Sequence, residues 1–109
     1  MPIPKKLRIC GFDYDIIHKE DLDHTQGCSG VHLPEKLEIR LLGRGIDPRR
    51  VENTFIHEIV HAVDVLFCND KLTEEQVACM ANGLYQVFSD NKLLNDKVFE
   101  NSSNQRGLK

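Results

Sequence analysis

The sequence predicts a single α+β domain in which a small antiparallel sheet of about three strands is followed by two main helices. Short apolar segments, two of them alternating with charged side chains, lie within the first 42 residues. Longer stretches with helical periodicity follow from residue 48 onwards, and each is preceded by a helix-start signal. Strands followed by helices are typical of α+β domains, in which helices pack on one side of an antiparallel sheet.

The first half of the chain is expected to form three strands, at residues 6–10, at residues 12–17 and within residues 31–42, where the pattern is clearest at 37–41. The first is rich in Leu and Ile, and the other two alternate apolar with charged side chains, as a strand with one buried face does. Gly11 separates the first two strands. The polar stretch at residues 18–30 contains two glycines and is expected to be a loop.

A long helix is expected from Pro48 to about Cys68. Asp47 offers an N-cap acceptor, and proline is favoured at the first helical position because its φ is already helical there. Six apolar residues of this segment fall on the side of the helix opposite His57: Val51, Phe55, Ile56, Ile59, Val63 and Leu66. This stripe would dock on the core. Asn69 and the aspartate after it are expected to end the helix.

A second helix is expected from Thr73 to about Ser89. Thr73 is an N-cap residue, and Gln76 three positions later completes a capping-box pattern. Residues 92–100 could form a further helical turn or two.

The bulk composition predicts one domain at residues 1–100, followed by a polar, disordered tail at residues 101–109. With 40% hydrophobic and 28% charged residues, the chain is close to an average globular domain. The net charge of -3 does not favour nucleic acid as a partner. The apolar runs are too short to span a membrane and no signal peptide is recognised, so a cytoplasmic location is expected.

The most informative segment is His57-Glu58-Ile59-Val60-His61, an H-E-x-x-H motif on the first expected helix. A helix turns by ~100° per residue, so residues four apart lie ~40° apart on one face, where two imidazoles can bind one metal ion. Zinc accepts neutral imidazole nitrogens in a tetrahedral site. Glu58 lies at the edge of that face, where it can accept a proton from metal-activated water without being a ligand.

A third ligand is expected from the start of the second helix, which offers Glu74 and Glu75. Glu74 lies near the edge of this helix's apolar stripe and can face the first helix, whereas Glu75 lies almost opposite that stripe. Glu74 is therefore preferred as the third ligand, and Glu75 is the alternative. Either glutamate could instead be a first-turn acid that complements the helix dipole.

Asp64 lies on the same helix face as the histidines, seven residues after His57. We expect it to orient His57 or His61 by a hydrogen bond from behind the ligands. A direct ligand and an ordinary surface aspartate are the other interpretations. The motif indicates one zinc ion per chain and no other cofactor.

Residues 54–62 and 72–85 together resemble the zincin metallopeptidases, in particular the gluzincin branch, which carries H-E-x-x-H on one helix and a glutamate on the next. Within that branch the chain is most similar to compact ImmA/IrrE-like domains and to small phage and bacterial metallopeptidases. Members commonly have small or apolar residues three, six, seven and ten positions after the glutamate, and counting from Glu74 reproduces this pattern. The resemblance implies a minimal zincin-like fold, with residues 37–41 as the edge strand beside the cleft.

The resemblance implies a zinc-dependent metallopeptidase that hydrolyses peptide bonds, with Glu58 as general base. Its substrate would be a peptide or protein, and ImmA-type proteins usually act with a regulatory protein partner. The group that would stabilise the oxyanion is left open among Tyr14, His32 and Tyr85. The alternative is a catalytically silent, zinc-stabilised regulatory or protein-binding module, in which four protein ligands close the site that an enzyme leaves open.

Overall fold

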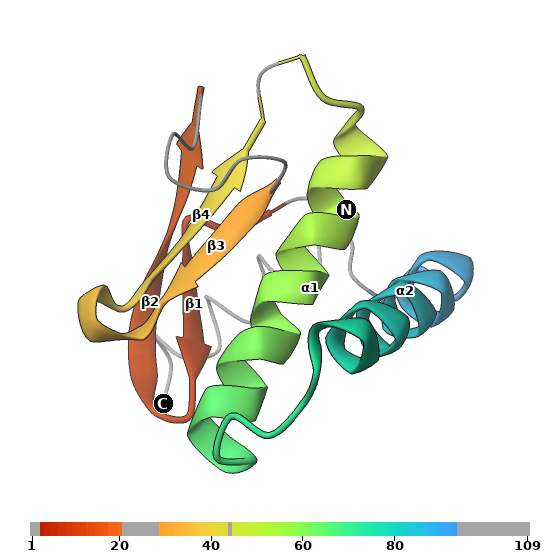
Figure 1. Cartoon of the computed structure of the whole chain (residues 1–109). Helices are drawn as coiled ribbons and strands as arrows, with labels where there is room; N and C mark the ends of the chain where they lie inside the picture. Colours follow the sequence, from red (N-terminus) through yellow and green to blue (C-terminus); the bar gives the residue numbers. More distant parts are fainter. Residues whose placement is uncertain (1–2, 21–28, 44, 94–109) are drawn as a thin grey trace, which may run out of the picture.

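The computed structural model describes residues 3–20, 29–43 and 45–93 as a four-stranded mixed sheet with two helices (Figure 1). The predicted α+β class is confirmed. In chain order the elements are β1 (Lys6–Ile9), β2 (Phe12–Lys19), β3 (Gly30–Leu33), a 3-10 turn (Pro34–Lys36), β4 (Glu38–Leu42), α1 (Pro48–Phe67) and α2 (Glu74–Asp90). The predicted tail at residues 101–109 lies outside the described residues, as does most of the segment 92–100.

Strands β1 and β2 form an antiparallel hairpin whose turn consists of Cys10 and Gly11. Both turn residues have a positive φ, 51° and 80°, as a two-residue turn of type I′ requires. Such a turn matches the twist of the strands that it joins, so Ile9 pairs directly with Phe12. The glycine predicted to separate two strands therefore lies in their connecting turn.

The sheet differs from the predicted three antiparallel strands in two respects. The stretch expected to contain one strand forms two, β3 and β4, and the strand order is β1-β2-β4-β3 with β2 and β4 parallel. Strand β3 has only four residues, Gly-Val-His-Leu, with no charged side chain to mark an alternation. Local sequence indicates neither such a short strand nor the direction in which two distant strands pair, because both depend on tertiary contacts.

The expectation that residues 37–41 form the edge strand beside the cleft is wrong. Strand β4 lies inside the sheet, where it pairs with β2 on one side and with β3 on the other. Two of its residues, Ile39 and Leu41, are fully buried. The edge of the described sheet nearest to α1 and the candidate site is β3.

Helix α1 lies between the sheet and α2, and it contacts both (Figure 1). Its start is as predicted, since the Asp47 side chain accepts a hydrogen bond of 2.8 Å from the amide of Arg49 and Pro48 follows the cap. The single apolar stripe predicted for this helix is not observed, because the helix is packed on two sides. Val63, expected within that stripe, is exposed, whereas Glu58 and Asp64 are buried.

Helix α2 begins with the predicted capping box. The hydroxyl of Thr73 accepts a hydrogen bond of 3.0 Å from the amide of Gln76, and the Gln76 side chain accepts one of 2.9 Å from the amide of Thr73. Only Val77 and Ala81 of this helix are buried. The helix packs on α1, on the side away from the sheet (Figure 1).

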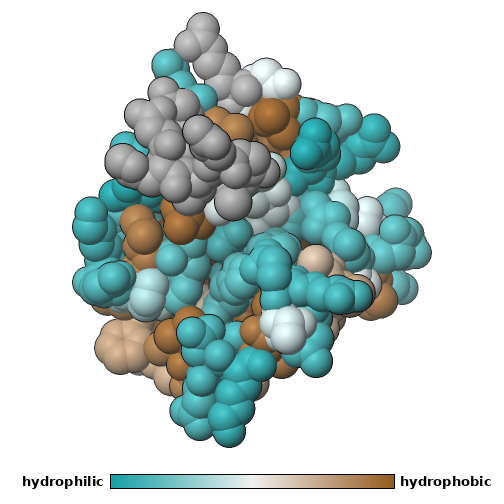
Figure 2. Space-filling model, viewed as in Figure 1, coloured by the Kyte–Doolittle hydropathy of each residue, from teal (hydrophilic) through white to brown (hydrophobic). Residues whose placement is uncertain are grey.

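The hydrophobic core is shared by the inner face of the sheet and the two buried sides of α1. Its largest fully buried apolar side chains are Tyr14, Phe55, Ile39, Leu41 and Val77. Hydrophilic residues cover most of the face seen in Figure 2, with smaller apolar patches between them. In the part of the chain that the structure describes, no helix has the length and apolar character needed to cross a membrane.

Gly30, the first residue of β3, is where the sheet approaches α1 most closely. A Cβ atom at this position would lie 2.7 Å from Cγ2 of Thr54 and 3.2 Å from Cγ of Glu58. It would also lie 3.2 Å from the backbone oxygen of Arg40 on the neighbouring strand. The absence of a side chain at Gly30 therefore lets α1, with Glu58, pack against β3.

We predict that Gly30→Ala lowers the free energy of unfolding by about 1–3 kcal/mol, because the added methyl group overpacks the contact between β3 and α1. Urea unfolding followed by circular dichroism measures this change. Gly83→Ala is the matched control, since a Cβ at Gly83 meets nothing within 4 Å and the residue lies within α2. The control should stabilise the protein by up to about 1 kcal/mol. Equal stabilities for the two variants would contradict the tight contact at Gly30.

Candidate metal centre

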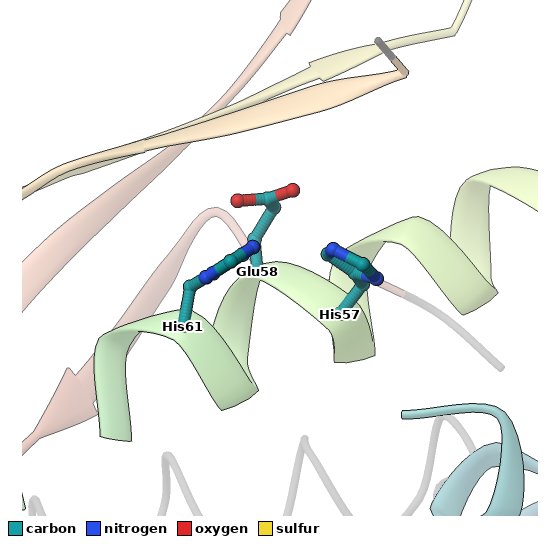
Figure 3. A group of neighbouring side chains, drawn as sticks. All are labelled: His57, Glu58 and His61. Atoms are coloured by element: carbon teal, nitrogen blue, oxygen red, sulfur yellow. The ribbon is translucent and has the colours of Figure 1, made fainter. Parts of the chain in front are cut away.

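His57, Glu58 and His61 lie together near the middle of α1, as the H-E-x-x-H spacing predicts (Figure 3). One potential ligand atom from each residue can be chosen so that all three lie within 4.8 Å of one another. The two imidazole rings meet edge to face, with their centroids 4.8 Å apart. Both histidines are partly exposed, so their nitrogens can be reached from solvent.

The carboxylate of Glu74 bridges the two histidines from α2. One of its oxygens lies 2.7 Å from Nε2 of His57, and the other lies 3.1 Å from Nε2 of His61. Three potential ligand groups from two helices therefore converge on one point. Glu75, the alternative, is exposed and takes no part in this contact.

The local structure of α2 explains why Glu74 rather than Glu75 meets the histidines. Glu74 is the first residue of the helix, directly after the Thr73 cap. Successive residues of a helix point ~100° apart, so only one of two adjacent glutamates can face α1. The Glu74 side chain is 70% exposed, which leaves the point of convergence open to solvent on one side.

These donors fit a metal ion. Two imidazole nitrogens and one carboxylate oxygen are groups that bind divalent transition metals, and two of them on one helix face are four residues apart. Glu58 also lies close to both histidines, but it directly follows His57 on the helix and it is only 5% exposed. Glu74 contacts both imidazole nitrogens directly, so we take Glu74 as the third donor and Glu58 as the group beside it.

The Glu58 carboxyl has unusual electrostatics for a glutamate. Burial raises its pKa to about 7, and the negative charge of nearby Glu74 contributes to the shift. No described residue donates a hydrogen bond to its carboxylate, which lines the cleft and is not sealed from solvent there. A cation bound by the histidines would act in the opposite direction, because positive charge favours the ionised carboxylate.

A third histidine, His32 of β3, faces the same cleft from the sheet. Its Nε2 atom lies 2.9 Å from the hydroxyl of Tyr14, whose side chain is fully buried. Burial lowers the pKa of His32, and the neighbouring His61 lowers it further, whereas Glu35 opposes the shift. Burial also raises the pKa of Tyr14, so a neutral imidazole faces a protonated hydroxyl at neutral pH.

The cleft that joins these groups has a volume of about 840 Å³. Helices α1 and α2 contribute His57, Glu58, His61 and Glu74 to it, and β3 contributes residues 30–32. Tyr85, one of the three residues that could have stabilised the oxyanion, does not line this cleft. Its hydroxyl donates a hydrogen bond to Glu52, and it lines a separate pocket.

Asp64 forms different contacts from those expected. Its side chain is 1% exposed, and its carboxylate accepts hydrogen bonds from the backbone amides of Lys71 and Leu72. It forms no hydrogen bond with His57 or His61 in the described structure. Its position on the helix suggested the histidines as partners, but the chain after α1 turns back over the side chain and supplies amide donors instead.

Comparisons of the chain with protein-family models, with curated proteins and with solved structures found no significant match.

We predict that Glu74→Ala lowers the affinity for zinc by at least about 10-fold, because it removes one of three donors. Glu75→Ala, at the adjacent exposed position, should leave the affinity unchanged within error. Isothermal titration calorimetry on protein without a histidine tag measures both dissociation constants. Loss of affinity in the Glu75 variant alone would show that the wrong glutamate has been assigned.

Proposed function

We propose that this protein is a zinc-dependent metallopeptidase of the zincin type, close to the gluzincin branch. The observation that carries the proposal is the convergence of Glu74 on Nε2 of both histidines, beside the largely buried carboxyl group of Glu58, whose pKa burial raises. A metal site that served only to hold the fold would not need such a carboxylate next to its ligands.

In this proposal His57, His61 and Glu74 hold the zinc ion. Zinc would supply a Lewis acid that polarises the scissile carbonyl and makes water acidic enough to react near neutral pH. The donor set supports zinc, because imidazole and carboxylate with an open position are typical of catalytic zinc sites.

Glu58 acts as the general base and then as the general acid. Its carboxylate accepts a proton from the attacking water and passes that proton to the leaving amide nitrogen. Burial raises the pKa of Glu58 in the bare protein, whereas zinc held by the histidines would lower it again, so the carboxylate would be ionised and able to accept a proton when the metal is bound. Its position between α1 and β3 places it at the inner wall of the cleft (Figure 3).

Strand β3 supplies the surface for an extended peptide. It is one of the two edge strands of the described sheet, and it lines the cleft beside Glu58. An extended substrate can add to such an edge through main-chain hydrogen bonds, which bind a peptide without selecting its sequence. Residues 37–41 of β4, the segment predicted to be the edge strand beside the cleft, cannot bind a peptide in this way because β4 is paired on both sides. We therefore assign peptide binding to β3.

His32 is the proposed stabiliser of the oxyanion that forms on the substrate carbonyl. In this proposal the Tyr14 hydroxyl donates a hydrogen bond to Nε2 of His32, and the proton of the neutral imidazole is then on Nδ1. A neutral imidazole held by a second group can then donate a hydrogen bond to developing negative charge. His32 is supported over Tyr85 because it lines the same cleft as the two helix histidines.

We predict that Glu58→Gln abolishes peptide hydrolysis while zinc remains bound at one ion per chain, because glutamine keeps the shape but cannot accept the proton. Cleavage of a fluorogenic peptide library by zinc-loaded protein measures the activity, and elemental analysis measures the zinc. Glu75→Gln is the control and should keep normal activity. Hydrolysis at the normal rate by the Glu58 variant would overturn the assignment. A zinc-loaded wild type that cleaves nothing would favour the silent regulatory or protein-binding module.

We predict that His32→Ala lowers kcat by about 100-fold with little change in KM, since a group that stabilises the transition state alone affects mainly kcat. Tyr14→Phe should have a smaller effect in the same direction, about 10-fold, because the imidazole remains but loses its orientation. Steady-state kinetics on a peptide cleaved by the wild type measure both. An increase in KM at constant kcat would assign His32 to substrate binding instead.

A further inference from the structure

Asp64 is a buried carboxylate that the proposed mechanism does not use. It lies on α1 one turn beyond the H-E-x-x-H motif, and it is 1% exposed. One carboxylate oxygen accepts hydrogen bonds of 3.0 Å from the amide of Lys71 and 3.2 Å from the amide of Leu72. The second oxygen also accepts from the amide of Leu72, at 3.2 Å. A charged acceptor with backbone donors is a strong contact when it is removed from water.

The backbone of Asp64 also binds the start of the turn between the helices, which comprises residues 68–73. Its carbonyl oxygen accepts hydrogen bonds of 2.9 Å from the amide of Cys68 and 3.0 Å from the amide of Asp70. Within this turn Asn69 and Asp70 both have a φ of 57°, in the left-handed region that asparagine and aspartate adopt more readily than most residues. Asp64 therefore binds the chain where it leaves α1 and again where it approaches α2.

This turn leads directly to the third donor of the metal centre. Only Thr73 separates Leu72, which Asp64 binds, from Glu74, which contacts the histidines. Thr73 caps α2, so the first turn of the helix starts from a backbone that Asp64 has already placed. The Glu74 side chain is 70% exposed, and its described polar contacts are those with His57 and His61. Its position thus depends on where the backbone of the turn puts it.

We propose that Asp64 is a positioning residue of the metal centre, which acts through the turn between the helices by placing Glu74 opposite His57 and His61. The inference rests on the metal site of the proposed function, but not on peptide hydrolysis. Asp64 touches neither the metal nor the substrate. Its effect on metal affinity depends on Glu74, and this dependence separates it from a residue that only stabilises the fold.

The test is a double-mutant cycle on zinc affinity. The dissociation constant for Zn²⁺ is measured by competition with a chromophoric chelator for the full chain, for Asp64→Ala, for Glu74→Ala and for the double variant. We expect Asp64→Ala to weaken binding about 10-fold when Glu74 is present. When Glu74 has been replaced, the same change should weaken binding less than about 2-fold.

Two further variants separate positioning from general damage to the fold. Asp64→Asn keeps one acceptor oxygen for the amides of Lys71 and Leu72, so its affinity should fall between those of the wild type and Asp64→Ala. Tyr85→Phe removes a hydrogen bond between the helices at Glu52, away from the turn, and should leave the zinc affinity within about 2-fold of the wild type. Circular dichroism at the temperature of the titration verifies that each variant is folded. If Asp64→Ala does not fold, Asp64→Asn replaces it in the cycle.

The outcomes distinguish this inference from the proposed function. If the wild type binds zinc and the Asp64 variant weakens binding by the same factor with and without Glu74, Asp64 serves the fold alone and the positioning role is overturned. An unchanged affinity in a folded Asp64 variant overturns it as well. If the wild type takes up no zinc, the metal centre itself is overturned, and the positioning role with it.

Discussion

The packing of α1 on two sides is the constraint on which the site depends. Its buried residues form two groups, one with Phe55 and Ala62 and the other with Ile56 and Val60, and at ~100° per residue these lie roughly 130° apart. Such a distribution is expected for a helix that contacts the sheet on one side and α2 on another. The histidines of the motif lie on the wider arc between these two groups, roughly 100° from one and roughly 130° from the other, and they line the cleft there. The cleft is therefore a consequence of how three layers meet, which allows a short chain to build one.

The two buried carboxylates of helix α1, Asp64 and Glu58, have opposite hydrogen-bonding environments. Asp64 accepts amide hydrogen bonds that satisfy both of its carboxylate oxygens where water is excluded. Glu58 receives none from the described residues, and its pKa is raised by burial and, to a smaller extent, by the negative charge of nearby Glu74. The first arrangement is stabilising and rigid, whereas the second keeps a proton acceptor in an unfavourable state that a bound cation would relieve. The contrast within one helix distinguishes a group that holds the structure from one available for chemistry.

The elements that sequence predicted well are those with local signals. Proline after an aspartate cap and the threonine of the capping box mark both helix starts, because these residues satisfy amide groups of their own first turns. The short strand β3 carries no such signal, and neither does the parallel pairing of β2 with β4. As a result the edge strand was assigned to the wrong segment. The partners predicted for Asp64 are wrong, since no sequence pattern indicates that the chain seven and eight residues later turns back to give it amide donors.

By itself the sequence determined that two histidines and a glutamate lie on one helix face, because the helical repeat alone brings residues four apart together. It also favoured Glu74 over Glu75, since only one of two adjacent residues can face a neighbouring helix. Tertiary structure alone decided that the Glu74 carboxylate reaches both imidazoles, that β3 with His32 forms the opposite wall, and that Glu58 is buried between them. These facts depend on the distance between elements far apart in the chain, and that distance is set by the packing of the core rather than by any local pattern.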